Sequence, residues 1–365
     1  MISVYVRNKD LCPASYYRIT QYLNQYPDVI FHNIASDAMF TRNQYVDRQG
    51  VKYKIWQLRY FVHMMLRGAW YTVLDLHAKP ETVIVSRSIY PHKSPRLGIE
   101  LLRHVMGHAE IVIWDFDDDI FLNGEITDRE AALLEEKSDR IVVTHDYLKS
   151  RLPDVYQKKV ICMPTTDGDF QRFVSVDKER MIKNRLETLQ REIRLVWVGQ
   201  AVGLRYFKPI LKELDRFAQI QRAKFGRSTI LSIVCNKDLM ADCRFLKIKN
   251  IRWSKNAALQ CMQESQIGIM PLEDKPYSKG KGGFKLVQYL SAGLPVIGSN
   301  VGYNKQVVNE KVGYLAKDTE WCDKLLLLSD ANVWKVKAIN SFEYWKQNFS
   351  YDFNAKIWEK LLQKI

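Results

Sequence analysis

The stretch PLEDKPYSKGKGGFKLVQYLSAGLPVIGSNVGYN, residues 271–304, carries the strongest signal in the chain. It starts at the end of an apolar run, passes through a loop of glycines and lysines, and enters a helical pattern near Phe284. Glycines let backbone N–H groups approach an anion, and the start of the following helix favours negative charge. With Lys285 adding positive charge, the stretch predicts a diphosphate site. Taken alone, the loop also suits a flexible surface segment.

Short apolar runs rich in Val and Ile alternate with helical periodicity on both sides of this stretch. That alternation is typical of βαβ units and parallel sheets, so the predicted fold class is α/β. Strands are expected at 2–6, 82–86, 110–116, 140–144, 193–199, 229–235, 251–253, 267–271 and 295–299.

The length of 365 residues favours two domains, at roughly 100–200 residues each. We expect a Rossmann-like domain at 1–166, a polar linker at 167–192, and a second Rossmann-like domain at 193–340. A helical segment is expected at 341–365. Ligands of open α/β sheets bind beyond the carboxyl ends of the strands, so residues directly after strands are the candidates for chemistry.

The composition, 47% hydrophobic and 26% charged, is that of a globular protein. No run approaches the ~20 apolar residues that span a bilayer, and the opening residues resemble a buried strand, so we expect a cytoplasmic chain without a signal peptide. The six cysteines include no C-x-x-C pair, and the seven histidines show no ligand spacing. These patterns predict reduced thiols and no metal site.

The net charge of +14 points to nucleic acid, an anionic membrane or phosphorylated substrates as partners. Because no basic tail or nucleic-acid module is present, nucleic acid is not expected. Helix 51–75 suits either a membrane interface or a core helix whose basic side chains face water. The residues that would suit a membrane interface are the basic Lys52, Lys54, Arg59 and Arg67 and the apolar Trp56, Phe61, Met65 and Trp70.

The acidic run DFDDD, residues 115–119, allows three interpretations. It could be the metal site of a GT-A glycosyltransferase, or the strand end of a haloacid-dehalogenase phosphatase with Asp115 as nucleophile. By resemblance to enzymes with a DFDD strand end, the run could also face the acceptor and the donor sugar of a sugar transfer, with neighbouring carboxylates raising one another's pKa. We favour Asp117 and Asp118 over Asp119. A solvated acidic turn that caps the next helix stays open.

PLED (271–274), GKGGFKLVQYLSAGLPVI (280–297) and SNVG (299–302) resemble the family-four retaining nucleotide-sugar glycosyltransferases, the group-1 type. Segments such as PASYYRI (13–19) and IVIWDFDDDIF (111–121) resemble further strand ends of that family, in order. The subgroup indicated has a DFDD strand end and a GKxxFKLxQY loop. The resemblance implies the GT-B architecture: two Rossmann-like domains facing across a cleft, with a C-terminal helix crossing back to the N-terminal domain.

The resemblance also implies roles for individual residues, with no metal required. Arg205 fits an ordinary helix start equally well, and Trp253 fits ordinary side-chain packing equally well. For the acceptor-side residues, a purely structural role is likewise as well supported as contact with a substrate. The expected catalytic residues are Asp117, Asp118, Lys285 and Arg205. The expected donor-binding residues are Gly199, Gln200, Trp253, Asp274, Gly280, Lys281, Gly282, Gly283, Phe284 and Gln288, and the acceptor-side residues are Tyr17, Arg18 and Arg87.

The sequence departs from the family in one motif, the pair of glutamates that flanks the Gly/Lys loop and the start of the following helix. Many relatives place a glutamate at each end of a seven-residue spacer, one for the ribose and one for the donor sugar. Here Gln288 stands at the ribose position and Gly280 at the sugar position. Asp274 or Glu273 could read the sugar instead, from the preceding turn.

The expected reaction is sugar transfer from a UDP- or GDP-linked donor to a glycan or lipid-linked glycan in cell-surface polysaccharide synthesis. Capsule and lipopolysaccharide synthesis are the pathways implied, and a lipid-linked acceptor would add peripheral contact with the inner membrane leaflet. The sequence leaves monomer and homodimer open. Three rival classes also stay open: a metal-dependent GT-A-like transferase, a haloacid-dehalogenase phosphatase, and a non-catalytic sugar-nucleotide-binding protein.

Overall fold

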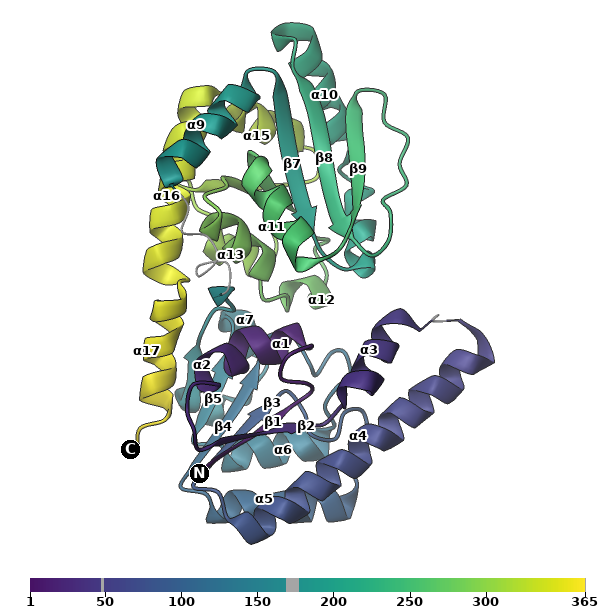
Figure 1. The fold of residues 1–365 in the computed structure, drawn as a ribbon, viewed down its shortest axis with the longest axis vertical. Helices are drawn as coiled ribbons and strands as arrows, with labels where there is room; N and C mark the ends of the chain where they lie inside the picture. The colour runs from purple at the N-terminus through teal and green to yellow at the C-terminus, as the bar shows by residue number, and fades with distance from the viewer. Residues whose placement is uncertain (47–48, 169–176, 365) are drawn as a thin grey trace. The chain divides into compact units, whose positions relative to one another are not determined.

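The computed structural model describes residues 1–46, 49–168 and 177–364. Its chain forms two compact units (Figure 1). Unit 1 comprises Met1–Thr165, Gly280–Gly282 and Asn354–Ile365, and unit 2 comprises Thr166–Lys279 and Gly283–Phe353. Of the predicted linker, residues 169–176 lie outside the described residues, as does residue 365 of the predicted terminal segment.

Unit 1 is built on a six-stranded parallel sheet in the order β2-β1-β3-β4-β5-β6. Its strands are β1 (Ile2–Val6), β2 (Val29–Asn33), β3 (Thr82–Ser86), β4 (Ile111–Phe116), β5 (Arg140–Val143) and β6 (Val160–Cys162). Its helices are α1 (Pro13–Ser15), the π-helical turn η1 (Tyr16–Thr20), α2 (Gln21–Leu23), α3 (Asp37–Tyr45), α4 (Gly50–Ala78), α5 (Arg96–His108), α6 (Asp128–Lys137), α7 (Asp146–Lys149), the 3-10 turn η2 (Asp154–Lys159) and most of α17 (Tyr351–Leu361).

Local sequence explains these elements. The central strands β3 and β4 are buried along their whole length, which fits their nearly continuous apolar sequences. Helix α6 begins where the Thr127 hydroxyl accepts a hydrogen bond from the Glu130 N–H, and its first turn carries acidic residues that suit the helix dipole.

The last helix, α17, completes unit 1. The Trp358 indole N–H donates to the Arg18 carbonyl at 2.8 Å, and the Asn354 amide donates to the Pro164 carbonyl at 2.6 Å. These contacts join residues 354–361 of α17 to unit 1, whereas residues 341–353 of the predicted terminal segment group with unit 2.

Unit 2 has a second six-stranded parallel sheet, in the order β12-β11-β10-β7-β8-β9. Its strands are β7 (Glu192–Val198), β8 (Ser228–Cys235), β9 (Leu246–Arg252), β10 (Ile267–Met270), β11 (Val296–Ser299) and β12 (Gly313–Ala316). Its helices are α9 (Lys178–Leu189), the 3-10 turn η3 (Ala201–Phe207), α10 (Leu211–Phe225), α11 (Lys255–Glu264), α12 (Pro276–Lys279), α13 (Phe284–Ser291), α14 (Asn304–Val307), α15 (Trp321–Leu328) and α16 (Ala331–Asn348).

A buried arginine joins three helices of unit 2. Arg185, on α9, donates hydrogen bonds of 2.8 Å to the Met262 and Gln263 carbonyls near the end of α11 and to the Ala292 carbonyl after α13. Carbonyls at helix ends lack partners within the helix, so Arg185 satisfies two ends at once. Burial lowers the pKa of its guanidinium to about 9.

Each sheet has one topological switch point, where the order of its strands reverses direction. In unit 1 this point lies between β1 and β3, and in unit 2 it lies between β7 and β10. The carboxyl ends of strands at a switch point form the usual ligand crevice of open α/β sheets. Residues after β1, β3, β7 and β10 are therefore the candidates for ligand contact.

Candidate functional site

Unit 1 gathers charged side chains at the carboxyl ends of β1, β3 and β4. Arg87, directly after β3, donates from Nε and a terminal nitrogen to Glu125 at 3.0 and 2.6 Å. Arg7, directly after β1, donates to the same carboxylate at 2.9 Å. Arg87 also forms an ion pair with Asp117. The structure thus brings together Arg87 and Asp117, both expected from sequence.

Arg87 has an unusual backbone for a residue other than glycine, with φ of 64°. Its N–H donates to the Asp115 carbonyl at 2.7 Å, and its own carbonyl accepts from the Trp114 indole at 2.9 Å. A left-handed conformation costs such a residue about 1–2 kcal/mol. Strain of this kind persists where neighbouring contacts enforce it, and it is found often at functional sites.

The four aspartates of the acidic run have different environments. Asp115 is buried against Arg18, Asp117 is partly buried beside Arg87, and the Asp118 carboxylate lies 4.0 Å from Arg87 with about a third of its side chain exposed. Asp119 accepts from the Leu122 N–H at 2.9 Å and pairs with Arg151 at 3.1 Å, as a turn-capping residue would. Asp118 is thus the most accessible of the first three.

Burial is the main cause of the pKa shifts in this run. It raises the pKa of Asp117; Arg87 opposes this shift, and Asp118 adds to it. Burial likewise raises the pKa of Asp115, against the effect of Arg18. Mutual repulsion, the cause expected from sequence, is therefore a smaller contribution than desolvation.

Arg18 was expected on the acceptor side, but it lies inside unit 1. Its side chain and that of Asp115 are 0% and 1% exposed. Arg18 contacts both Asp115 oxygens through Nε at 2.9 Å, and it donates to the Met163 carbonyl at 2.9 Å. This placement leaves no guanidinium surface for a substrate. Asp115, with both oxygens occupied, is also poorly placed to act as the nucleophile of a phosphatase. Tyr17, the neighbour of Arg18, is half-buried.

The Glu125 ion pairs predict a specific acid dependence of stability. Burial raises the pKa of Glu125, but Arg87 and Arg7 outweigh it and lower the value from 4.5 to about 2. A carboxylate with a lowered pKa stabilises the fold above its unfolded pKa, and that stability is lost as pH falls toward the folded value. We expect Glu125→Gln to cost about 3 kcal/mol at pH 7.

The measurement is urea unfolding from neutral pH down to pH 3. The wild-type free energy of unfolding should approach that of Glu125→Gln as the pH falls below 4.5. Glu136→Gln is the matched control, because Glu136 forms exposed ion pairs worth at most about 1 kcal/mol. Parallel pH profiles for wild type and Glu125→Gln would contradict the assignment.

In unit 2, Lys285 lies across Gly199 at the end of β7. A β-carbon on Gly199 would come within 2.7 Å of the Lys285 Cε and 2.6 Å of the Trp197 ring. The Lys285 ammonium lies 5.7 Å from the centre of that ring. Only glycine therefore allows the lysine to pass over the strand end. Gln200, the next residue, is exposed.

Helix α13 is fixed against the same strand end. Its Tyr289 hydroxyl accepts a hydrogen bond from the Val198 N–H at 3.0 Å. Gly283 precedes the helix with φ of 63° and, as a glycine, has no side chain of its own to cap the helix start. Phe284 in the first turn is half-buried, as is Gln288, whose amide donates to Asp167 at 2.9 Å. The loop residues Gly280, Lys281 and Gly282 group with unit 1.

Three other donor-side candidates lie on the surface of unit 2. Arg205, in η3, stacks on the ring of Tyr206 at 5.0 Å. Trp253 is about half exposed. Asp274 is exposed and pairs with Lys279 at 3.2 Å, and Glu273 pairs with Lys275 at 2.7 Å. Arg205, Trp253 and Asp274 are exposed and Glu273 is half-buried, so a ligand can reach each of them.

Sequence reasoning missed several contributors to the two switch points. Arg7 directly follows a predicted strand, so the rule applied to the other strand ends would have found it. Glu125 and Asp167 lie in irregular segments without a pattern. In unit 2, the Ser299 hydroxyl accepts from the Leu272 N–H at 2.9 Å and so shapes the loop after β10.

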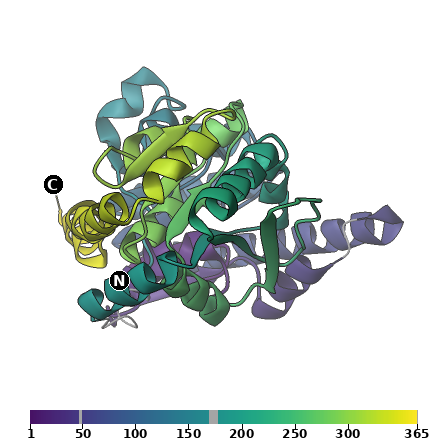
Figure 2. The same ribbon diagram turned by 90° about the horizontal axis from the view of Figure 1, so that it is seen from above.

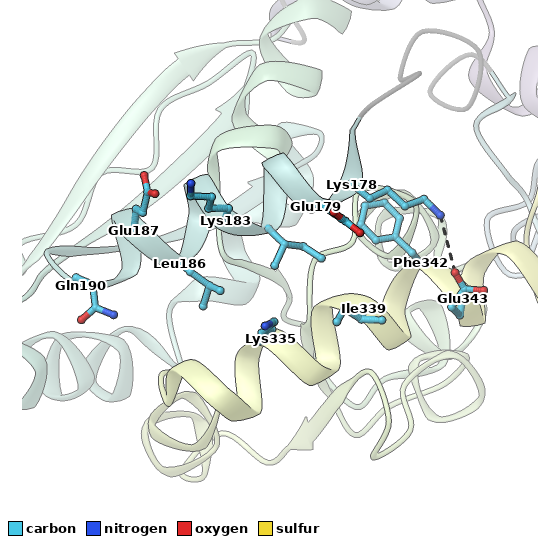
Figure 3. Close-up of a pocket in the computed structure, with 11 residues that line it drawn as sticks. Lys178, Glu179, Lys183, Leu186, Glu187, Gln190, Lys335, Ile339, Phe342 and Glu343 are labelled. Carbon is cyan, nitrogen blue, oxygen red and sulfur yellow. Dashed lines mark ion pairs between the residues drawn. The ribbon is translucent and has the colours of Figure 1, made fainter.

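A cavity of about 680 Å³ lies elsewhere in unit 2, between α9 and α16 (Figure 3). Its lining includes Ile182, Leu186 and Phe342, and an ion pair of 3.9 Å joins Lys178 to Glu343. None of the site residues expected from sequence lines it. Over the described ranges, no group of three or more His, Cys, Asp or Glu is arranged to hold a metal ion.

The two parallel sheets with their helices have the GT-B fold, as the sequence predicted. HepE of Anabaena in complex with UDP is similar in fold, with a TM-score of 0.66, 11% identity, and coverage of 100% of this chain and 99% of that one. A glycosyltransferase from Rickettsia africae has a TM-score of 0.59 and 10% identity, with coverage of 100% and 99%.

The same fold also occurs with a different activity. UDP-GlcNAc 2-epimerase of Neisseria meningitidis has a TM-score of 0.50 and 12% identity, with coverage of 99% of this chain and 98% of that one. By sequence, no family model and no curated protein matches the chain. The structural likeness therefore establishes the fold alone.

Proposed function

We propose that this chain is a retaining glycosyltransferase of the family-four type that uses a nucleotide-sugar donor. The observation that carries the proposal is the switch point of unit 2. There Gly199 lets Lys285 cross the end of β7, and helix α13 begins directly after the Gly/Lys loop. Fixed cations and helix amides at a switch point suit a diphosphate. Support also comes from HepE, whose structures contain UDP or UDP-glucose, so a UDP-linked donor ranks ahead of a GDP-linked one.

In the proposed reaction, an acceptor hydroxyl oxygen bonds to the anomeric carbon while the bond from that carbon to the β-phosphate oxygen breaks. The hydroxyl proton passes to the departing phosphate, and the attack occurs on the face that the phosphate leaves, so configuration is retained. Lys285, Arg205 and the loop amides of Gly282 and Gly283 stabilise charge on the nucleoside diphosphate, as preorganised groups can without a metal. Gln288 contacts the ribose through its amide oxygen.

The remaining roles are proposed from the site residues. Asp274 or Glu273 reads the donor sugar in place of the glutamate absent at Gly280. Asp117 and Asp118 orient the acceptor hydroxyl with Arg87 and Tyr17. The acceptor is a glycan or lipid-linked glycan of cell-surface polysaccharide synthesis, as in capsule or lipopolysaccharide, and the reaction occurs at the cytoplasmic face of the membrane.

The experiment that tests donor binding is thermal unfolding with nucleoside diphosphates and nucleotide sugars, with and without EDTA. A ligand at about 100 times its Kd stabilises the fold by about 2.7 kcal/mol, which raises Tm by roughly 5–10 °C in a domain of this size. We expect UDP to give this shift with EDTA present.

Two alanine variants localise the binding. In Gly199→Ala the new β-carbon displaces Lys285, so the UDP shift should fall by more than half. Gly203→Ala is the matched control, because its β-carbon would meet the Trp197 ring at 2.8 Å and no atom of Lys285. An equal UDP shift in the two variants would refute the donor site. Binding of a nucleotide sugar without turnover would instead favour the non-catalytic alternative.

A further inference from the structure

Helix α4 of unit 1 is apolar on two sides. One side is buried through Trp56, Tyr60, Met64, Gly68, Thr72 and Asp75. A second set of large apolar side chains, which we call the outer row, has exposed fractions from 37% to 72%. The outer row consists of Val51, Ile55, Leu58, Val62, Leu66, Trp70, Val73 and Leu74.

The outer row lies opposite the buried side. Leu58, Leu66 and Trp70 each follow a buried residue by two positions, which is a rotation of about 200° in a helix with 3.6 residues per turn. Both views show the amino-terminal part of α4, together with α3, extending away from the sheet of unit 1 (Figures 1 and 2). A helix that is apolar all round is normally buried all round, and an exposed patch of this extent marks an interaction surface.

The residues that form the exposed apolar surface of α4 differ from those expected from sequence. Trp56, expected from sequence to suit an interface, is 4% exposed and belongs to the core. Phe61 and Met65 are half-buried. Trp70 keeps its place in the exposed set, at 61%. The apolar surface therefore comes mainly from aliphatic residues that the pattern of basic and aromatic residues did not single out.

The charges on α4 are of one sign at its surface. Lys52, Lys54 and Arg59 are exposed, and Arg67 is half-buried and donates to the Asn33 carbonyl at 2.8 Å. The one acidic residue from Gly50 to Ala78 is Asp75, which is buried and accepts from the Tyr5 hydroxyl at 2.7 Å. The outer row is therefore accompanied by cations and by no exposed carboxylate.

We propose that the outer row of α4 docks on an anionic lipid surface, lying parallel to the membrane plane. An amphipathic helix binds such a surface by burying apolar side chains below headgroups that attract its cations. A second copy of this chain would instead bring like cations together with no carboxylate on α4 to pair with them. In the described part of the chain, no helix is long and apolar enough to cross a membrane. This surface is independent of the transfer reaction proposed above.

The test is sedimentation of the full chain with vesicles, either of phosphatidylcholine alone or of equal parts phosphatidylcholine and phosphatidylglycerol. The apolar variant carries Ile55→Gln, Leu58→Gln and Leu66→Gln. The matched control carries Val155→Gln, Met240→Gln and Val336→Gln, at positions of similar or greater exposure outside the outer row. A charge variant carries Lys52→Gln, Lys54→Gln and Arg59→Gln. Thermal unfolding checks that each variant is folded.

We expect wild type and control to bind the anionic vesicles, and the apolar variant to bind them roughly tenfold more weakly or worse. The charge variant should bind more weakly than wild type, and wild-type binding should fall as added salt shortens the Debye length from about 10 Å at 0.1 M. Three results would overturn the proposal: equal binding by apolar variant and control, equal binding to neutral vesicles, or a solution dimer that the apolar variant abolishes without any vesicle binding.

Discussion

Replacing Arg18 by methionine is expected to lower the free energy of unfolding by about 3–5 kcal/mol, because it leaves a carboxylate buried without its cation. The Asp115 side chain is 1% exposed, and Arg18 contacts both of its oxygens. The same substitution removes the donor to the Met163 carbonyl and the 3.0 Å bond to the Thr165 hydroxyl. Arg18 thereby links β4 to the segment after β6. Urea titration at pH 7 measures the loss.

The pH dependence separates a buried charge from ordinary loss of packing. Burial already raises the pKa of Asp115, and loss of Arg18 should raise it further. A carboxyl whose folded pKa is raised contributes stability below its unfolded pKa and loses it as pH rises through the folded value. The deficit of Arg18→Met should therefore shrink from pH 7 to pH 5.

A second substitution provides the control for Arg18→Met. Adding Asp115→Asn removes the unpaired charge, so the double variant should recover part of the loss at pH 7 and show little pH dependence. Trp358→Phe removes the indole contact to the Arg18 carbonyl and changes no charge. It should therefore show no shrinking of its deficit at low pH. A pH-independent deficit in Arg18→Met would contradict the role of the ion pair.

The central strands were predictable from sequence because burial on both faces gives them continuous apolar runs. The runs at 2–6 and 82–86 coincide with β1 and β3. The predictions failed at sheet edges: β2 and β12 were not predicted, and β9 was expected only at 251–253. Edge strands have weaker apolar patterns, as the mixed burial of β9 shows.

The sequence predicted where the candidate site residues lie along the strands better than it predicted which residues they contact. The rule that ligands bind beyond strand ends selected Gly199 and Arg87, which follow strands at the switch points, and Asp117, which pairs with Arg87 from the end of β4. The sequence could not give the partners of these residues, because pairing across a sheet depends on the strand order. Glu125 is the clearest example, since no local pattern distinguishes it from a surface glutamate. Arg18 is the opposite case: its position beside a switch point suggested substrate contact, but its side chain forms a buried ion pair with Asp115.

Replacing Lys285 by alanine is expected to lower kcat for the proposed transfer by about 10²–10³, the usual effect of removing one preorganised group that stabilises developing charge. Lys285 is held over Gly199 beside the Trp197 ring, so its ammonium is positioned before a donor binds. Charge on the diphosphate grows as the glycosidic bond breaks, so the effect should fall on kcat more than on KM. Release of UDP from UDP-glucose measures both constants.

Two further lysine variants distinguish a specific phosphate contact of Lys285 from an effect of the protein's net charge. Lys305→Ala removes an exposed lysine of the same unit, at α14, and should change kcat by less than twofold. Lys285→Arg keeps the positive charge and should recover part of the lost activity, although the planar guanidinium does not reproduce a compact ammonium. If Lys285→Ala and Lys305→Ala lower kcat equally, net charge of the protein is the cause and a specific phosphate contact is excluded. If Lys285→Ala raises KM and leaves kcat unchanged, the lysine binds the ground state and does not assist departure of the diphosphate.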